Sequence, residues 1–262
     1  MRCVAMMVVA VAVLVLAPTA RADWPGVTAK WDQGSGGHDP WGFASWIDDV
    51  NGTAMTADDF LCTAPGPIKE IEFAGYSAFG NAYINGFRVT FWTDVPATAA
   101  DASHPGSLIY DRTIGPANPG DPLKIGWQDL GNEWFLINLS TSDWFWQEGG
   151  GTSPMVYWIG IQGVMAADGY GDAFYWYAVP RTIPSWGDDA AFESEYFGYP
   201  PWANWGWPTN DAGASPDLYD GPFPAGWANS ADAAFTLRVP EPATLCLMGA
   251  GAIGMLLRRR RK

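Results

Sequence analysis

Aromatic side chains are the first residues in this chain whose types and spacing could do chemistry. The chain holds 16 tryptophans, and residues 196–208 carry six aromatics among prolines, glycines and an asparagine. Tryptophan and tyrosine faces stack on the C–H surfaces of sugars, and nearby Asn and Asp side chains can bind hydroxyl groups. The segment therefore predicts a loop that binds carbohydrate through Tyr199, Trp202, Trp205 and Trp207. A loop that packs on itself and covers one end of a β-domain would show the same pattern.

Pairs of acidic residues are the second candidate for chemistry, because Ca²⁺ binds six to eight oxygens from carboxylates and turn carbonyls. Asp58 and Asp59 stand just before an apolar segment and are the preferred pair for a structural calcium ion. None of the acidic runs has the spacing of an EF-hand loop. The alternative is that loop aspartates cap turns through their own hydrogen bonds. No other cofactor is expected.

Catalytic patterns are sparse, and we expect a protein that is not an enzyme. Glu193 and Glu195 adjoin the aromatic segment and are the best candidates for the carboxylates of a glycosidase. No nucleophile elbow, zinc-protease motif or phosphate-binding glycine loop occurs. The two histidines, His38 and His104, lie in segments rich in Gly, Pro and Asp. Cys62 is the single cysteine of residues 23–239 and is predicted to be a buried structural residue at the end of a strand.

Both ends of the chain carry segments that are typical of export signals. Arg2 precedes an apolar segment, Val4–Ala17, and Ala20-Arg21-Ala22 forms a small-x-small cleavage site. Residues 1–22 are thus predicted to be a signal peptide that signal peptidase removes. At the other end, Pro240-Glu241-Pro242 is followed by fifteen uncharged residues, 243–257, and by the basic residues 258–262.

The apolar segment 243–257 is short for a permanent anchor. As a helix it would span roughly 22 Å at about 1.5 Å per residue, whereas a bilayer core is about 30 Å thick. The basic end would stay in the cytoplasm by the positive-inside rule, which places the preceding domain outside. We therefore expect a transient insertion in the inner membrane; an ordinary C-terminal tail anchor is the alternative.

The order of a Pro-Glu-Pro tripeptide, a short apolar helix and an arginine cluster resembles the PEP-CTERM sorting signal. The resemblance covers residues 240–262, with Glu241 at the acidic position of the motif and Pro240 and Pro242 beside it. It implies that an exosortase, a membrane cysteine protease, recognises the tripeptide and removes the tail. It also implies a Gram-negative bacterium and a place in the cell envelope, on the outer surface or in the extracellular matrix.

Residues 23–239 are expected to form one all-β domain. Short apolar segments with a period of two alternate with segments rich in Gly, Pro, Asn and Asp. In Gly86–Thr93, for example, Phe87, Val89 and Phe91 would face one side and Arg88, Thr90 and Trp92 the other. About eight strands are predicted, which favours an antiparallel β-sandwich. They are Thr56–Cys62, Ile68–Ser77, Gly86–Thr93, Ser107–Ile114, Glu133–Leu139, Met155–Val164, Asp172–Val179 and Ala231–Val239, with Met155–Val164 central because it is apolar on both faces.

The domain also resembles a recurrent domain of unknown function in PEP-CTERM proteins. Asp58-Asp59-Phe60-Leu61-Cys62, the turn at Pro65-Gly66-Pro67, and Ser230–Phe235 before the tripeptide carry this likeness. It implies a jelly-roll-like sandwich at the cell surface and assigns no catalytic residue.

Charge excludes one class of partner. Residues 23–239 hold seven basic and 27 acidic side chains, a net charge near −20, whereas the whole chain has −14. Such a surface repels phosphate backbones, so nucleic acid is not expected as a partner. The sequence therefore predicts a non-catalytic exported protein associated with exopolysaccharide, and as the alternative a carbohydrate-binding module.

Overall fold

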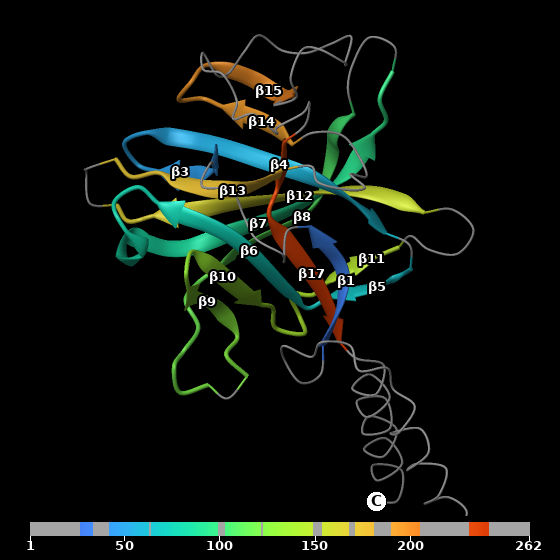
Figure 1. Ribbon diagram of the computed structural model, residues 1–262, viewed down its shortest axis with the longest axis horizontal. Coiled ribbons are helices and arrows are strands. Elements are labelled where there is room, and N and C mark those ends of the chain that lie inside the picture. The colour runs from blue at the N-terminus through green and yellow to red at the C-terminus, as the bar shows by residue number, and fades with distance from the viewer. Residues whose placement is uncertain are drawn as a thin grey trace, which may run out of the picture. The chain divides into compact units, whose positions relative to one another are not determined.

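Two β-sheets make up most of the described part of the protein. The computed structural model describes residues 27–33, 42–62, 64–98, 103–121, 123–148, 154–167, 171–180, 190–204 and 231–240. These residues form β-strands and one short 3₁₀ helix, η1 (Asn81–Tyr83) (Figure 1). The fold is thus all-β, as predicted. No helix in these ranges is apolar and long enough for a membrane crossing, and the predicted segments 1–22 and 243–257 lie outside them.

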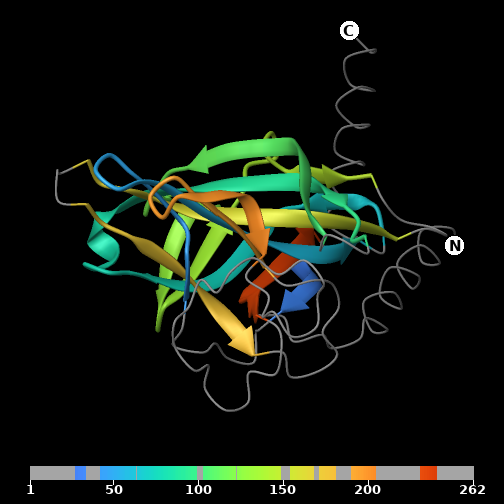
Figure 2. The same cartoon turned by 90° about the horizontal axis from the view of Figure 1, so that it is seen from above.

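The first sheet has seven strands in the order β15-β14-β4-β3-β12-β7-β8. They are β3 (Trp46–Asp48), β4 (Gly52–Cys62), β7 (Ile84–Val95), β8 (His104–Ile114), β12 (Met155–Met165), β14 (Ala191–Ser194) and β15 (Tyr199–Asn204). The long strands β7, β8 and β12 lie side by side (teal, green and yellow in Figure 2). β12 pairs with β3, β4 and β7, so its predicted central position is confirmed.

The second sheet has the order β1-β17-β6-β10-β9, with β13 pairing to β6, β16 and β2. Its strands are β1 (Val27–Gln33), β2 (Gly42–Ala44), β6 (Glu70–Ser77), β9 (Gly126–Gly131), β10 (Trp134–Asn138), β13 (Phe174–Pro180), β16 (Ala231–Ala233) and β17 (Phe235–Pro240). A separate pair joins β5 (Gly66–Ile68) to β11 (Phe145–Gln147). The first strand, β1, and the last, β17, are neighbours in the sheet (blue and red in Figure 1).

Aromatic rings from both sheets meet in one core. Phe73 of β6 lies 5.0 Å from Phe87 of β7, and Phe60 of β4 lies 6.3 Å from Phe235 of β17, measured between ring centroids. The period-two prediction for β7 is confirmed, since Phe87, Val89 and Phe91 are fully buried in this core. Edge-to-face ring pairs of this kind add to the free energy that burial of their area contributes.

β4 and β12 separate where the short strand β3 enters between them. β12 pairs antiparallel with β4 as far as Gly160 and then parallel with β3 at Gly163 and Val164. Two buried polar side chains fill the fork. Ser45 donates to the carbonyl of Ile161 at 2.5 Å, and Gln162 Nε2 donates to the carbonyl of Ala54 at 2.8 Å. The fork keeps its backbone groups hydrogen-bonded without a continuous ladder.

Three expectations on the strands need correction. The eight predicted strands are present, but the described residues contain seventeen, because short strands such as β2, β3 and β11 have too few residues for a period. The pairing of β3 with β12 is parallel, so the sheets are not purely antiparallel. Residues 199–204 form β15 and not a loop.

The strand β15 tolerates Pro200 and Pro201 because of its place in the sheet. It is an edge strand and pairs only with β14 among the described strands. Proline costs little on an edge or at a bulge, since no neighbour needs its missing N–H. Proline disfavours interior strands, and for this reason the proline-rich segment was predicted to be a loop. An edge strand accepts proline, so the segment can form β15.

Candidate functional site: the outer face of the seven-stranded sheet

Three tryptophans gather on the face of the seven-stranded sheet that points away from the core. Trp158 of β12 pairs with Trp92 of β7 on one side and with Asp59 of β4 on the other. Trp202 of β15 packs edge-to-face on Trp92, with ring centroids 5.1 Å apart. Trp158 is fully buried, whereas Trp92 and Trp202 are half-buried. We call Trp92, Trp158 and Trp202 the tryptophan cluster.

A carboxylate orients the centre of the tryptophan cluster. Trp158 Nε1 donates to Asp94 Oδ1 at 2.9 Å. Asp94 stands two residues after Trp92 on β7 and therefore faces the same side. Small residues, Ala57 and Ala191, complete the apolar floor on β4 and β14. The arrangement joins aromatic area with an acceptor for hydroxyl groups on one surface.

The position of Trp202 depends on a strained backbone conformation. Its φ is +58°, which a bulky side chain rarely adopts. In the pairing of β14 with β15, Phe192 faces Ala203 and Ser194 faces Tyr199, so residues 200–202 bulge opposite Glu193. Bulges next to functional sites often redirect a side chain, and here the bulge brings the indole of Trp202 to Trp92. Strained backbone of this kind is often found at functional sites.

The structure describes only part of the predicted carbohydrate-binding set. Trp202 is placed, whereas Trp205, Trp207 and the side chain of Tyr199 lie outside the described residues. The partners of Trp202, Trp92 and Trp158, were not in the predicted set. Trp92 carried a usable signal, because it is an aromatic residue on the predicted outward side of Gly86–Thr93.

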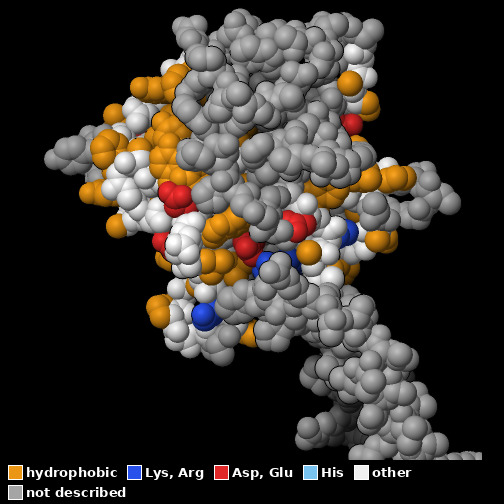
Figure 3. Space-filling model, in the orientation of Figure 1, with side chains coloured by type: hydrophobic (Ala, Val, Ile, Leu, Met, Phe, Trp, Pro, Cys, Tyr) orange, Lys and Arg blue, Asp and Glu red, His pale blue; other side chains and the backbone are white. Residues whose placement is uncertain are grey.

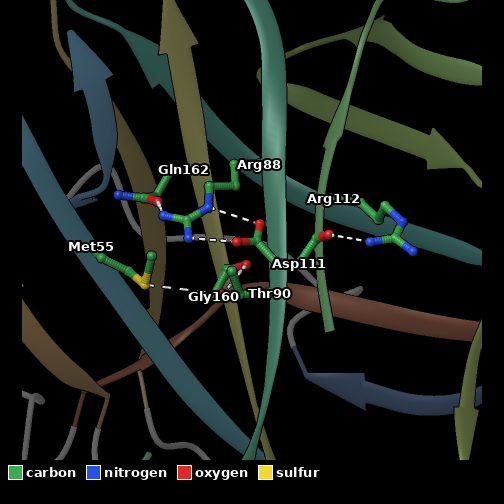
Figure 4. Close-up of polar contacts among 7 residues, drawn as sticks. All are labelled: Met55, Arg88, Thr90, Asp111, Arg112, Gly160 and Gln162. Carbon is green, nitrogen blue, oxygen red and sulfur yellow. Dashed lines mark hydrogen bonds and ion pairs between the residues drawn. The ribbon is translucent and has the colours of Figure 1, made fainter. Parts of the chain in front are cut away.

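Beside the tryptophan cluster the same face carries a network of polar side chains (Figure 4). Arg88 Nε and Nη2 donate to the two carboxylate oxygens of Asp111 at 2.9 and 2.8 Å, and Nη1 donates to Gln162 Oε1 at 3.0 Å. The bidentate bond to Asp111 raises the pKa of Arg88, and the same bond lowers the pKa of Asp111. Both charges are committed to each other, so the network holds β7, β8 and β12 in register.

Glu193 is the acidic residue of this face with an unusual electrostatic environment. Burial raises the pKa of Glu193, Arg88 opposes this rise, and Glu195 adds to it. Glu195 lies two residues further along and is exposed. Of the two candidate carboxylates of a glycosidase, Glu193 lies opposite residues 200–202 in the pairing of β14 with β15, and Glu195 follows the end of β14.

Asp58 and Asp59 do not converge on one ion position. They are consecutive on β4, so their side chains point to opposite faces. Asp58 Oδ2 accepts hydrogen bonds from Ala233 N at 2.6 Å and Gln33 Nε2 at 2.7 Å, and Oδ1 accepts from Asp59 N at 2.9 Å. Among the described residues no group of three or more His, Cys, Asp or Glu side chains could hold a metal. The calcium ion stays a prediction without a described ligand set.

Burial dominates the electrostatics of Asp58. The side chain lies between the sheets, and burial raises its pKa well above the ordinary range, with further upward contributions from Asp232 and Asp59. The backbone N–H groups of Ala233 and Asp59 oppose the rise in the pKa of Asp58 only in part. Asp58 therefore ties β1, β4 and β16 together at an electrostatic cost.

Other aspartates cap turns, as the alternative interpretation predicted. Asp48 Oδ1 accepts from the backbone N–H groups of Val50 and Asn51 at 2.9 and 2.6 Å. Asp48 Oδ2 accepts from Asp172 N at 3.1 Å. Cys62 is fully buried at the end of β4, which confirms its predicted structural role, and its thiol donates to the carbonyl of Ala64 at 3.1 Å.

Comparison with known families identifies two regions. A family model described as a domain of unknown function, DUF7901, matches residues 29–238. A model described as the PEP-CTERM protein-sorting motif matches residues 238–261. Neither a curated protein nor a solved structure is significantly similar to the chain.

Proposed function

Because the chain belongs to the DUF7901 family and ends in a PEP-CTERM sorting motif, we propose that it is a non-catalytic surface protein sorted by an exosortase-type system. The motif indicates export and attachment to the cell envelope. In this proposal signal peptidase removes residues 1–22 and the segment 243–257 enters the inner membrane transiently. The domain is a jelly-roll-like sandwich that associates with exopolysaccharide outside a Gram-negative cell.

One observation carries this proposal: the sorting motif follows the all-β domain directly. β17 supplies the last strand of the eight-stranded sheet, and the tripeptide Pro240-Glu241-Pro242 begins where that strand ends. In this proposal the motif directs the sorting of the all-β domain. Its acidic surface fits a place among hydrated polysaccharide, since like charge keeps the molecules apart and soluble. On the described part of the face in Figure 3, acidic and basic side chains are both scattered among hydrophobic and uncharged ones.

The mature C-terminus tests the sorting function. In envelope fractions of the native cell, mass spectrometry should find a C-terminus close to Pro240–Pro242. Replacement Glu241→Ala should leave the tail through Lys262 in place, because it removes the one charged side chain of the motif. The exposed Glu195→Ala serves as the matched control and should be processed normally. An envelope protein that retains Lys262 in the unchanged sequence would exclude removal of the tail.

A carbohydrate-binding module is the second candidate, and the strained Trp202 favours it. The half-buried rings of Trp92 and Trp202 offer apolar faces for a pyranose, and Asp94 lies beside them. Trp205, Trp207 and Tyr199 complete the proposed set of sugar-binding residues. In this view the tryptophan cluster gives the domain a defined glycan site.

Tryptophan fluorescence separates the two candidates. A glycan array chooses the oligosaccharide, and titration with it should change the emission saturably if a site exists. Trp202→Ala should then weaken binding by about tenfold, the effect of losing one stacking ring. Trp146→Ala is a suitable control, because Trp146 is 59% exposed on β11 and belongs to no part of the cluster. If no sugar gives a saturable change, the domain associates with the matrix without a defined site.

A further inference from the structure

The last strand of the domain is held on both sides. β17 lies between β1 and β6 in the sheet order, so it is not a frayed edge. Phe235 and Leu237 are fully buried in the core, and Thr236 is almost so. Release of this strand would therefore expose apolar side chains and break two ladders of hydrogen bonds together.

Polar contacts hold β17 up to its last residues. The carbonyl of Arg238 accepts from Lys69 N at 2.9 Å, and the Arg238 guanidinium forms an ion pair with Glu72 of β6. Thr236 Oγ1 donates to Asp32 Oδ1 of β1 at 3.0 Å. Only Val239 separates Arg238 from Pro240, so the hydrogen-bonded strand continues almost to the sorting motif.

The residue just before β17 is also fixed. Ala234 N donates to the carbonyl of Tyr177 at 2.8 Å, and Trp176 Nε1 donates to the carbonyl of Ala234 at 2.9 Å. Asp58 Oδ2 accepts hydrogen bonds from both Ala233 N and Gln33 Nε2, and these bonds connect residue 233 to β1. The C-terminal segment is therefore locked from residue 233 to residue 238.

A protease that cleaves at the motif needs an extended, accessible chain on both sides of its cleavage site. The residues on the N-terminal side are those that β17 commits to the sheet. We propose that docking of β17 and recognition of the motif by the sorting protease are mutually exclusive, so processing requires β17 to be released or not yet docked. The inference rests on the proposed sorting function and adds a regulation to it.

A covalent staple and a spacer test this proposal in the full chain. Leu237 and Ile71 face each other across β17 and β6, and both are fully buried. Directly paired residues have Cα separations that a disulfide can bridge. The pair Leu237→Cys and Ile71→Cys, in a Cys62→Ala background, would lock β17 when oxidised. A six-residue Gly-Ser spacer between Val239 and Pro240 would free the motif and would remove only Pro240, the last residue of β17, from the sheet.

Pulse-chase labelling in the native cell measures the rate of tail removal. The oxidised staple should slow processing by about tenfold, and the spacer should speed it by a similar factor, because cleavage follows the open fraction. The spacer placed in the stapled chain should restore processing, which separates blocked access from misfolding. The single variants Leu237→Cys and Ile71→Cys are the controls for lost core volume.

Two results would overturn the proposal: a stapled, folded chain processed at the normal rate, or a spacer that changes nothing. If the stapled chain does not fold, the spacer alone decides. Glu241→Ala, added to the spacer chain, must still block processing. If it does not, the sorting assignment fails, and this failure is distinct from failure of the strand proposal.

Discussion

At the scale of single residues, Asp58 shows how a buried charge can join distant segments. It accepts hydrogen bonds from β1, from its own strand and from β16, so one carboxylate connects both ends of the domain to its middle. Burial raises its pKa, which means that the folded state prefers the protonated form. Between the unfolded value near 3.8 and the raised folded pKa, the folded state binds more protons than the unfolded state. The contribution of Asp58 to stability therefore falls as pH rises through this window.

Replacement Asp58→Asn should remove that dependence. The free energy of unfolding of the variant should increase relative to that of the unchanged protein as pH rises from about 4 to 8. Urea unfolding at a series of pH values measures this difference. Asp49→Asn changes an exposed carboxylate and should leave the pH profile as it is. A difference that stays constant with pH would contradict the assignment of a raised pKa to Asp58.

At the scale of elements, side chains supply the hydrogen bonds at the fork, where β4 and β12 separate and no longer pair with each other. Gln162 is 1% exposed and satisfies three groups at once: the carbonyls of Ala54 and Trp46, at 2.8 and 3.4 Å, and Arg88 Nη1. Ser45 Oγ donates to the carbonyl of Ile161 at 2.5 Å and accepts from Thr56 N at 3.2 Å. The short strand β3 can enter the sheet only because these two side chains bind the backbone groups that its entry separates.

Replacement Gln162→Ala should therefore destabilise the domain by about 3 kcal/mol, because it leaves buried polar groups without a partner. Chemical denaturation of both proteins measures the loss. Gln128→Ala on β9, a half-buried position, should change stability by less than about 0.5 kcal/mol. A loss no larger than that of the control would show that the fork has another means of satisfying its backbone.

At the scale of the whole molecule, the two strands that adjoin the predicted signal peptide and the sorting motif are neighbours. β1 begins shortly after the signal peptide and β17 ends at the sorting motif, and the sheet order places them side by side. The eight-stranded sheet therefore needs both ends of the domain, because β1 comes from one end and β17 from the other. This pairing supports the proposal that processing requires release of β17, since release of β17 would also break the hydrogen bonds of β1.

Much of the fold could be predicted because period-two patterns are local. The inward face of β7 follows from side chains that alternate along the strand, and the central place of β12 follows from a segment that is apolar on both faces. Short strands such as β3 could not be predicted, since three residues hold no period. The strand β15 was missed because its tolerance of proline depends on its edge position, which is a property of the sheet.

The sequence by itself determined the all-β class, the sorting motif at the C-terminal end and the acidic character of the domain. Each of these is written in neighbouring residues or in composition, so no tertiary contact is needed to read it. Only the tertiary structure decided that Trp202 meets Trp92, that Asp58 holds both β1 and β16, and that β17 is an interior strand. These contacts join residues far apart in the chain, and strand pairing, which local pattern does not encode, brings them together.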